Sequence, residues 1–158
     1  MPGIVTSWSK ERAEEIIREH EGLEGAALPI LHALQAAFGF VPEDAVPMIA
    51  EALNLSRAEV HGIVTFYHDF RRTPPGRHIL KLCRAEACQS MGGDALADHA
   101  QERLRASWHE TTTDGALTLE PVYCLGLCAC APAGMLDDRV VGRLDRDRLD
   151  ALVEGARR

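Results

Sequence analysis

Two closely spaced pairs of cysteines constrain this chain more than any other feature. Four residues separate Cys83 from Cys88, three separate Cys124 from Cys128, and 35 residues lie between the two pairs. Two such pairs, far apart in the sequence, suit a metal centre, because each loop supplies two ligands and the fold brings the loops together. Thiolate sulfur is a soft ligand, which favours zinc, copper(I) or an iron–sulfur cluster.

The spacing within the pairs leaves alternatives open. Structural zinc usually takes C-x2-C hooks, and neither pair has that spacing. The wider loops suit a larger cofactor, such as a 2Fe–2S cluster with two thiolates on each iron. The C-x4-C-x2-C run of plant-type ferredoxins is absent. A zinc site and a disulfide or inert thiols remain alternatives. The fifth cysteine, Cys130, is a spare thiol, a small core residue or a replacement for Cys128.

Composition and charge argue against several classes of function. Of the 158 residues, 46% are hydrophobic, which is enough for a sizeable core, and the net charge of −7 argues against a nucleic-acid-binding protein. The sequence has no apolar run as long as a membrane span, and its first residues lack the basic and apolar regions of a signal peptide. An odd number of cysteines in such a chain favours a reducing compartment, so we expect a cytoplasmic protein.

The N-terminal part is predicted to be a helical domain. Apolar residues recur at helical spacing over 9–20, 30–38, 46–53 and 56–67. Ser9 is a plausible N-cap, Gly39 is placed to end the second helix, and Ser56 and Glu59 form a capping-box sequence. Two prolines and a glycine within 71–76 cannot continue a helix. We therefore expect one domain over 1–74 and a second over 75–158.

The C-terminal part mixes strands and helices. Strands are predicted over 78–82, delivering Cys83, and over 117–122, delivering Cys124, with a helix over 94–108 between them. A hairpin turning at Asp137-Asp138 and a last helix capped by Asp145 follow.

The chain lacks the motifs of a catalytic or nucleotide-binding protein. It contains no dinucleotide or P-loop motif and no nucleophile–base motif, so we expect no catalytic residue and no NADH site in this chain. The scattered histidines form no pair beside the cysteine loops, and Asp137-Asp138 is interpreted as a turn. The absence of C-x-x-C argues against a thiol oxidoreductase.

The cysteine pattern resembles that of the thioredoxin-like 2Fe–2S ferredoxins. The motifs that carry the resemblance are C-x4-C, then C-L-G-x-C-x-x-A-P, with G-F-V-P at 39–42 and E-V-H-G-I-V-T-F-Y at 59–67. The resemblance implies a mixed α/β architecture: an N-terminal helical bundle, then a thioredoxin-like domain that carries one 2Fe–2S cluster. It also implies four ligands, with Cys128 favoured over Cys130 because C-x3-C matches the family: Cys83, Cys88, Cys124 and Cys128.

The same family includes the small peripheral-arm subunit of complex I and related subunits of NAD-reducing hydrogenases and formate dehydrogenases. The first loop, 83–93, with Arg84 and Glu86 inside it, resembles the gamma subunit of soluble molybdenum-dependent formate dehydrogenases more than the complex I subunit. This implies an electron-transfer subunit beside a flavin- and NADH-binding beta subunit and a large molybdenum- and iron–sulfur-containing alpha subunit. The equivalent subunit of complex I or of a hydrogenase, and a zinc-stabilised interaction module, are the alternatives.

Overall fold

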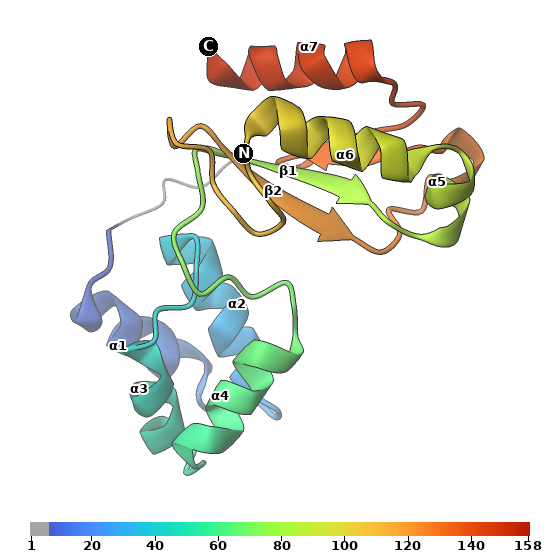
Figure 1. Ribbon diagram of the computed structural model, residues 1–158. Helices are drawn as coiled ribbons and strands as arrows, with labels where there is room; N and C mark the ends of the chain where they lie inside the picture. The colour runs from blue at the N-terminus through green and yellow to red at the C-terminus, as the bar shows by residue number, and fades with distance from the viewer. Residues whose placement is uncertain (1–6) are drawn as a thin grey trace. The chain divides into compact units, whose positions relative to one another are not determined.

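The chain folds into two compact units, each with its own buried core. The computed structural model describes residues 7–158, and the division falls between Met1–Pro74 and Pro75–Arg158 (Figure 1). No helix in the described range combines the length and apolar character that a membrane-spanning segment needs.

The first unit contains the helices α1 (Lys10–His20), α2 (Ala27–Phe38), α3 (Ala45–Ala52) and α4 (Arg57–Phe66). Local signals set three of their ends, as predicted. The Ser9 side chain accepts a hydrogen bond from the Arg12 N–H, and Gly39 ends α2 with a φ of 81°. Ser56 and Glu59 form both bonds of the capping box. The apolar faces meet in one cluster whose largest fully buried members are Ile30, Leu31, Leu34, Phe38 and Ile49.

One prediction for α4 is wrong. The helical spacing was expected to run as far as Tyr67, but α4 ends at Phe66 and Tyr67 takes an extended backbone with 43% of its surface exposed. Its ring packs edge-on against Phe66 and Phe70, with centroids 5.1 and 6.2 Å away. These aromatic contacts form where the chain turns out of the helix, and helical periodicity does not encode them.

The second unit is a four-stranded mixed sheet with helices on one face. Its strands are β1 (His78–Cys83), β2 (Leu117–Val122), β3 (Gly134–Leu136) and β4 (Arg139–Val141), in the order β2-β1-β3-β4. The strands β1 and β2 are parallel, and the other neighbouring pairs are antiparallel. Figure 1 shows α6 (Gly93–Leu104) and α7 (Arg146–Arg157) on the same side of the sheet. Leu80, Leu82, Leu117 and Leu119 face them in one buried cluster.

Two details of this unit differ from the prediction. The helix expected over 94–108 ends at Leu104, because Arg105 adopts a left-handed conformation with a φ of 52°. The cysteine loops also contain two short helices that periodicity did not reveal, α5 (Glu86–Ser90) and the 3-10 turn η1 (Cys128–Cys130).

The predicted cap of α7 and the predicted hairpin turn are confirmed. Asp145 caps α7 by accepting a hydrogen bond from the Arg148 N–H at 2.8 Å. Asp137 lies in the turn of the β3–β4 hairpin, where its carboxylate accepts a hydrogen bond from the Ile79 N–H at 2.9 Å and contacts His78 Nδ1 at 2.7 Å. Asp137 therefore ties the hairpin to β1.

The capping box of α4 is open to a direct test. Ser56→Ala removes the acceptor for the Glu59 N–H, and we expect it to lower the free energy of unfolding by about 1 kcal/mol. Urea unfolding followed by circular dichroism measures the change. Thr113→Ala, at an exposed loop position, serves as the control and is expected to change stability by less than about 0.5 kcal/mol. Equal stability of the Ser56 variant and the unsubstituted protein would contradict this account of the cap.

Candidate metal centre

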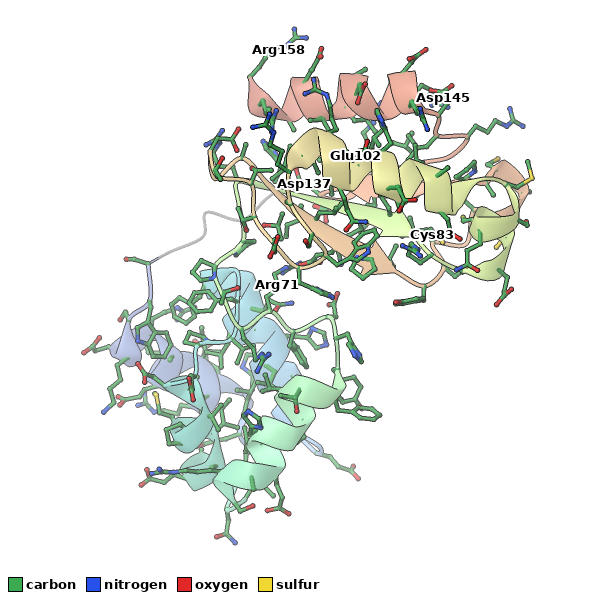
Figure 2. The ribbon with its side chains drawn as sticks, in the orientation of Figure 1. Arg71, Cys83, Glu102, Asp137, Asp145 and Arg158 are labelled. Carbon is green, nitrogen blue, oxygen red and sulfur yellow. The ribbon has the colours of Figure 1, made fainter. Side chains whose placement is uncertain are left out.

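The parallel pairing of β1 and β2 brings the two cysteine loops to the same edge of the sheet. Cys83, the last residue of β1, lies in register with Val122, the last residue of β2, and Cys124 follows two residues later. The Arg84 N–H donates to the Val122 carbonyl at 2.8 Å, which extends the pairing beyond the strands. Figure 2 shows Cys83 where β1 ends. The carboxyl ends of both strands therefore deliver a cysteine to the same place.

The first pair of cysteines is buried. Cys83 and Cys88 are 5% and 2% exposed and pack with Ala133 in a small apolar cluster. The Cys83 N–H donates to the Ala133 carbonyl at 2.9 Å, and α5 carries Cys88 back into hydrogen-bonding contact with the Cys83 thiol. The short helix therefore turns the chain back so that the two cysteines of the C-x4-C motif meet.

The second pair is exposed to solvent. The sulfur atoms of Cys124 and Cys128 are 3.7 Å apart. Metal–thiolate bonds of about 2.3 Å at a tetrahedral angle place two sulfur atoms roughly 3.8 Å apart, so this pair has the separation of two thiolates on one metal. Gly126, with a φ of 75°, turns its N–H toward Cys124 Sγ at 3.3 Å. A backbone donor therefore points at the sulfur of Cys124.

The pKa values of the two buried thiols are shifted in opposite directions. Burial raises the pKa of Cys83, while hydrogen bonds from the Ala85 N–H and the Cys88 thiol lower it. Backbone N–H groups of Cys124 and Leu125 lower the pKa of Cys83 further, and the net result is a pKa below the usual value. Burial and the hydrogen bond with Cys83 raise the pKa of Cys88. The backbone donors of both loops therefore favour negative charge on the Cys83 sulfur.

The two pairs are close enough to influence each other. The charge of Cys128 contributes to the raised pKa of Cys88. The pKa of Cys128 is raised mainly by its hydrogen bond with Cys124, with a smaller contribution from the charge of Cys83. Each pair of cysteines therefore meets within its own loop, and the two pairs lie within electrostatic range of each other.

Cys130 lies against a different part of the chain. A Cβ atom at Gly142 would be 2.7 Å from the Cβ of Cys130, and the Cys130 carbonyl accepts from the Arg143 N–H. This contact packs Cys130 against the end of the β3–β4 hairpin.

Other candidate ligands of the described residues do not gather at this site. His78 contacts Asp137, and His99 contacts Asp150 at 3.0 Å. Within residues 7–158, no three or more His, Cys, Asp and Glu side chains are arranged to hold a single metal ion.

Apolar side chains of the second loop shield part of the site. Leu125, Leu127 and Ala131 are partly buried and pack against the Cys83–Cys88 cluster. Ala129, which lies in η1 between Cys128 and Cys130, is exposed.

Gly93 makes a close contact whose role the sequence analysis missed. A Cβ atom at this position would lie 2.6 Å from the Cys88 carbonyl oxygen and 2.9 Å from its carbon. Only glycine allows α6 to begin so near the first cysteine loop. The consecutive glycines at 92 and 93 are the sequence signal that could have revealed this contact.

Comparison with known proteins agrees with this geometry. The family model for the thioredoxin-like 2Fe–2S ferredoxin matches residues 13–157. The chain belongs to this family. Its fold is therefore the thioredoxin-like 2Fe–2S ferredoxin fold, as predicted, and its cofactor is a single 2Fe–2S cluster. The match decides between the iron–sulfur and zinc alternatives that the cysteine spacing leaves open.

Several relatives are subunits of NADH-linked complexes. An NADH-quinone oxidoreductase subunit of Pseudomonas aeruginosa is 34% identical over 96% of this chain and 91% of its own length. An NADH-quinone oxidoreductase subunit of Rhizobium meliloti is 36% identical over 94% of this chain and 88% of its own length. A crystal structure of an NAD+-reducing NiFe-hydrogenase in the H2-reduced state has a TM-score of 0.67 and 30% identity, covering 80% of this chain. The match spans only 22% of the hydrogenase chain.

The tight contact at Gly93 predicts how this position responds to a side chain. Gly93→Ala pushes against the Cys88 backbone, and we expect it to destabilise the protein by about 1–3 kcal/mol and to reduce the iron bound per chain. Gly155→Ala is the matched control, because no atom lies within 4 Å of its added Cβ and alanine favours a helix by about 1 kcal/mol. Thermal unfolding and iron analysis measure both effects. Equal iron content and stability in the two variants would refute the packing argument.

Proposed function

We propose that Cys83, Cys88, Cys124 and Cys128 hold the 2Fe–2S cluster. In this proposal the buried Cys83 and Cys88 share one iron, and the exposed Cys124 and Cys128 share the other. The 3.7 Å separation of the Cys124 and Cys128 sulfur atoms is the observation that carries it. The contact between Cys83 and Cys88 and the electrostatic influence of each pair on the other support it.

The role that follows is electron transfer within a larger enzyme, with no catalysis by this chain alone. When bound, the cluster accepts and returns one electron at a time. The exposure of the Cys124–Cys128 pair supports electron exchange on that side, and the apolar packing around Cys83 and Cys88 supports shielding on the other. The chain supplies the ligands, the backbone donors and the apolar cover.

We further propose a soluble, cytoplasmic, NAD-dependent formate dehydrogenase as the parent enzyme, with this chain as its gamma subunit. The support is the resemblance of the first cysteine loop, in which Arg84 and Glu86 stand between the first two cysteines. The partners would be a flavin- and NADH-binding beta subunit and a large alpha subunit with a molybdenum cofactor and iron–sulfur clusters. Exposed Phe66 and Tyr67, 73% and 43% accessible, support a docking role for the helical unit.

Two other parent enzymes have specific support. The names of the Pseudomonas and Rhizobium relatives favour NADH:quinone oxidoreductase, and the hydrogenase structure favours an NAD-reducing hydrogenase. All three candidates share an NAD-linked electron-transfer step, so the ligand proposal holds for each.

Alanine substitution tests the ligand set. We expect Cys83→Ala, Cys88→Ala, Cys124→Ala and Cys128→Ala each to lose most of the bound iron and acid-labile sulfide, because alanine offers no ligand atom. Cys130→Ala is the matched control and should keep both. The measurement is iron and sulfide per chain after anaerobic purification. If Cys130→Ala loses the cluster while Cys128→Ala keeps it, the fourth ligand has been assigned wrongly.

Co-purification from the native host tests the parent enzyme. A tagged chain is expected to bring down an assembly that reduces NAD with formate, because its beta and alpha partners would supply the NAD site and the molybdenum centre. Eluate from an untagged strain is the control. Hydrogen-dependent NAD reduction, or the recovery of quinone-reductase subunits, would reject formate dehydrogenase and leave the cluster proposal intact.

A further inference from the structure

Arg84 occupies a fixed position next in the chain to Cys83, a proposed cluster ligand. It follows Cys83 in the chain, and its N–H is bonded to the Val122 carbonyl. The guanidinium Nη2 lies 3.0 Å from Asp94 Oδ1, and its central carbon lies 5.4 Å from the centre of the Trp108 ring. Contacts from two different segments therefore hold the guanidinium, and a third contact holds the Arg84 backbone.

Asp94 brings the opposite charge to the same place. It lies in the first turn of α6, which begins at Gly93 against the Cys88 carbonyl. Each member of the ion pair is thus linked to one of the buried cysteines. Arg84 follows Cys83 in the chain, and Asp94 lies on the helix that packs on Cys88.

The two charges are unequally exposed to solvent. The Arg84 side chain is 26% exposed, whereas the Asp94 side chain is 59% exposed. Water screens an exposed charge more strongly than a partly buried one, so the charge of Arg84 is screened less than that of Asp94.

We propose that the Arg84–Asp94 pair sets the reduction potential of the cluster. The inference rests on the proposed function. A one-electron reduction adds one negative charge between the cysteine loops, and net charge is one of the properties that tune such potentials. Arg84 favours the reduced state, and Asp94 both orients Arg84 and offsets part of its charge. Both are positioning residues that act through their electric field.

Removing each charge separately gives opposite expected results. Arg84→Gln should shift the ratio of reduced to oxidised protein at a fixed solution potential about three- to tenfold toward oxidised. For a one-electron couple this is a potential lower by about 30–60 mV, since tenfold corresponds to about 59 mV. Asp94→Asn should shift the ratio in the reverse direction by a smaller factor. Arg84→Lys keeps the charge and should stay within about twofold of the unsubstituted protein.

Arg103→Gln is the matched control. Arg103 is also an arginine in an ion pair, with Glu154 at 3.2 Å, but it lies in the last turn of α6, at the opposite end of the helix from Asp94. The Arg103→Gln substitution removes the same charge as Arg84→Gln and should leave the reduction potential nearly unchanged. Raising the ionic strength should shrink the shifts of the Arg84 and Asp94 variants, as expected for partly exposed charges.

The measurement is an anaerobic redox titration of the purified full-length chain, followed by the electron paramagnetic resonance signal of the reduced state. Opposite shifts for Arg84→Gln and Asp94→Asn support the proposal. Shifts of the same sign, or none, in cluster-containing variants overturn it. If Arg84→Gln fails to assemble, a potential in Asp94→Asn that is unchanged or lowered is sufficient to overturn it. Absence of any cluster in the unsubstituted protein would refute the proposed function itself.

Discussion

The parallel pairing of β1 with β2 is the constraint on which the site depends. Parallel strands end at the same edge of a sheet, and the register that places Cys83 opposite Val122 sets the first cysteine loop beside the second. The antiparallel addition of β3 brings Ala133 under Cys83, where its carbonyl accepts the Cys83 N–H. The helices α6 and α7 stabilise this sheet through the leucines of its covered face. The cysteines thus meet because the buried core holds the two strands in this register.

The site that results is asymmetric, and its asymmetry is functional in the proposed account. Cys83 and Cys88 are buried, while Cys124 and Cys128 face solvent. Backbone N–H groups of both loops converge on the Cys83 sulfur, and Gly126 directs another at Cys124. These backbone N–H groups stabilise negative charge on the sulfur atoms without themselves carrying a full positive charge. In the proposed account, the charges of Arg84 and Asp94 then influence the reduction potential from the side of the sheet that α6 covers.

Sequence reasoning succeeded where the signal is local. Caps such as Ser9, the Ser56–Glu59 box and Asp145 satisfy backbone donors within one turn, so their chemistry is readable in a few consecutive residues. It failed where distant contacts decide, as at Tyr67, whose ring turns to Phe70, and at Gly93, whose neighbour is the Cys88 carbonyl. Cysteine spacing alone did not distinguish a cluster from zinc; family motifs did. The parent enzyme is harder still to predict, because its substrate chemistry takes place in another chain.

Native mass spectrometry of the chain, purified without oxygen, tests the central claim most directly. The account predicts a mass above that of the polypeptide by two irons and two sulfides, with no zinc, and a return to the polypeptide mass when the cluster is removed by a chelator and an oxidant. A chain that carries a single zinc ion, or that gains iron without sulfide, would contradict the account at its foundation.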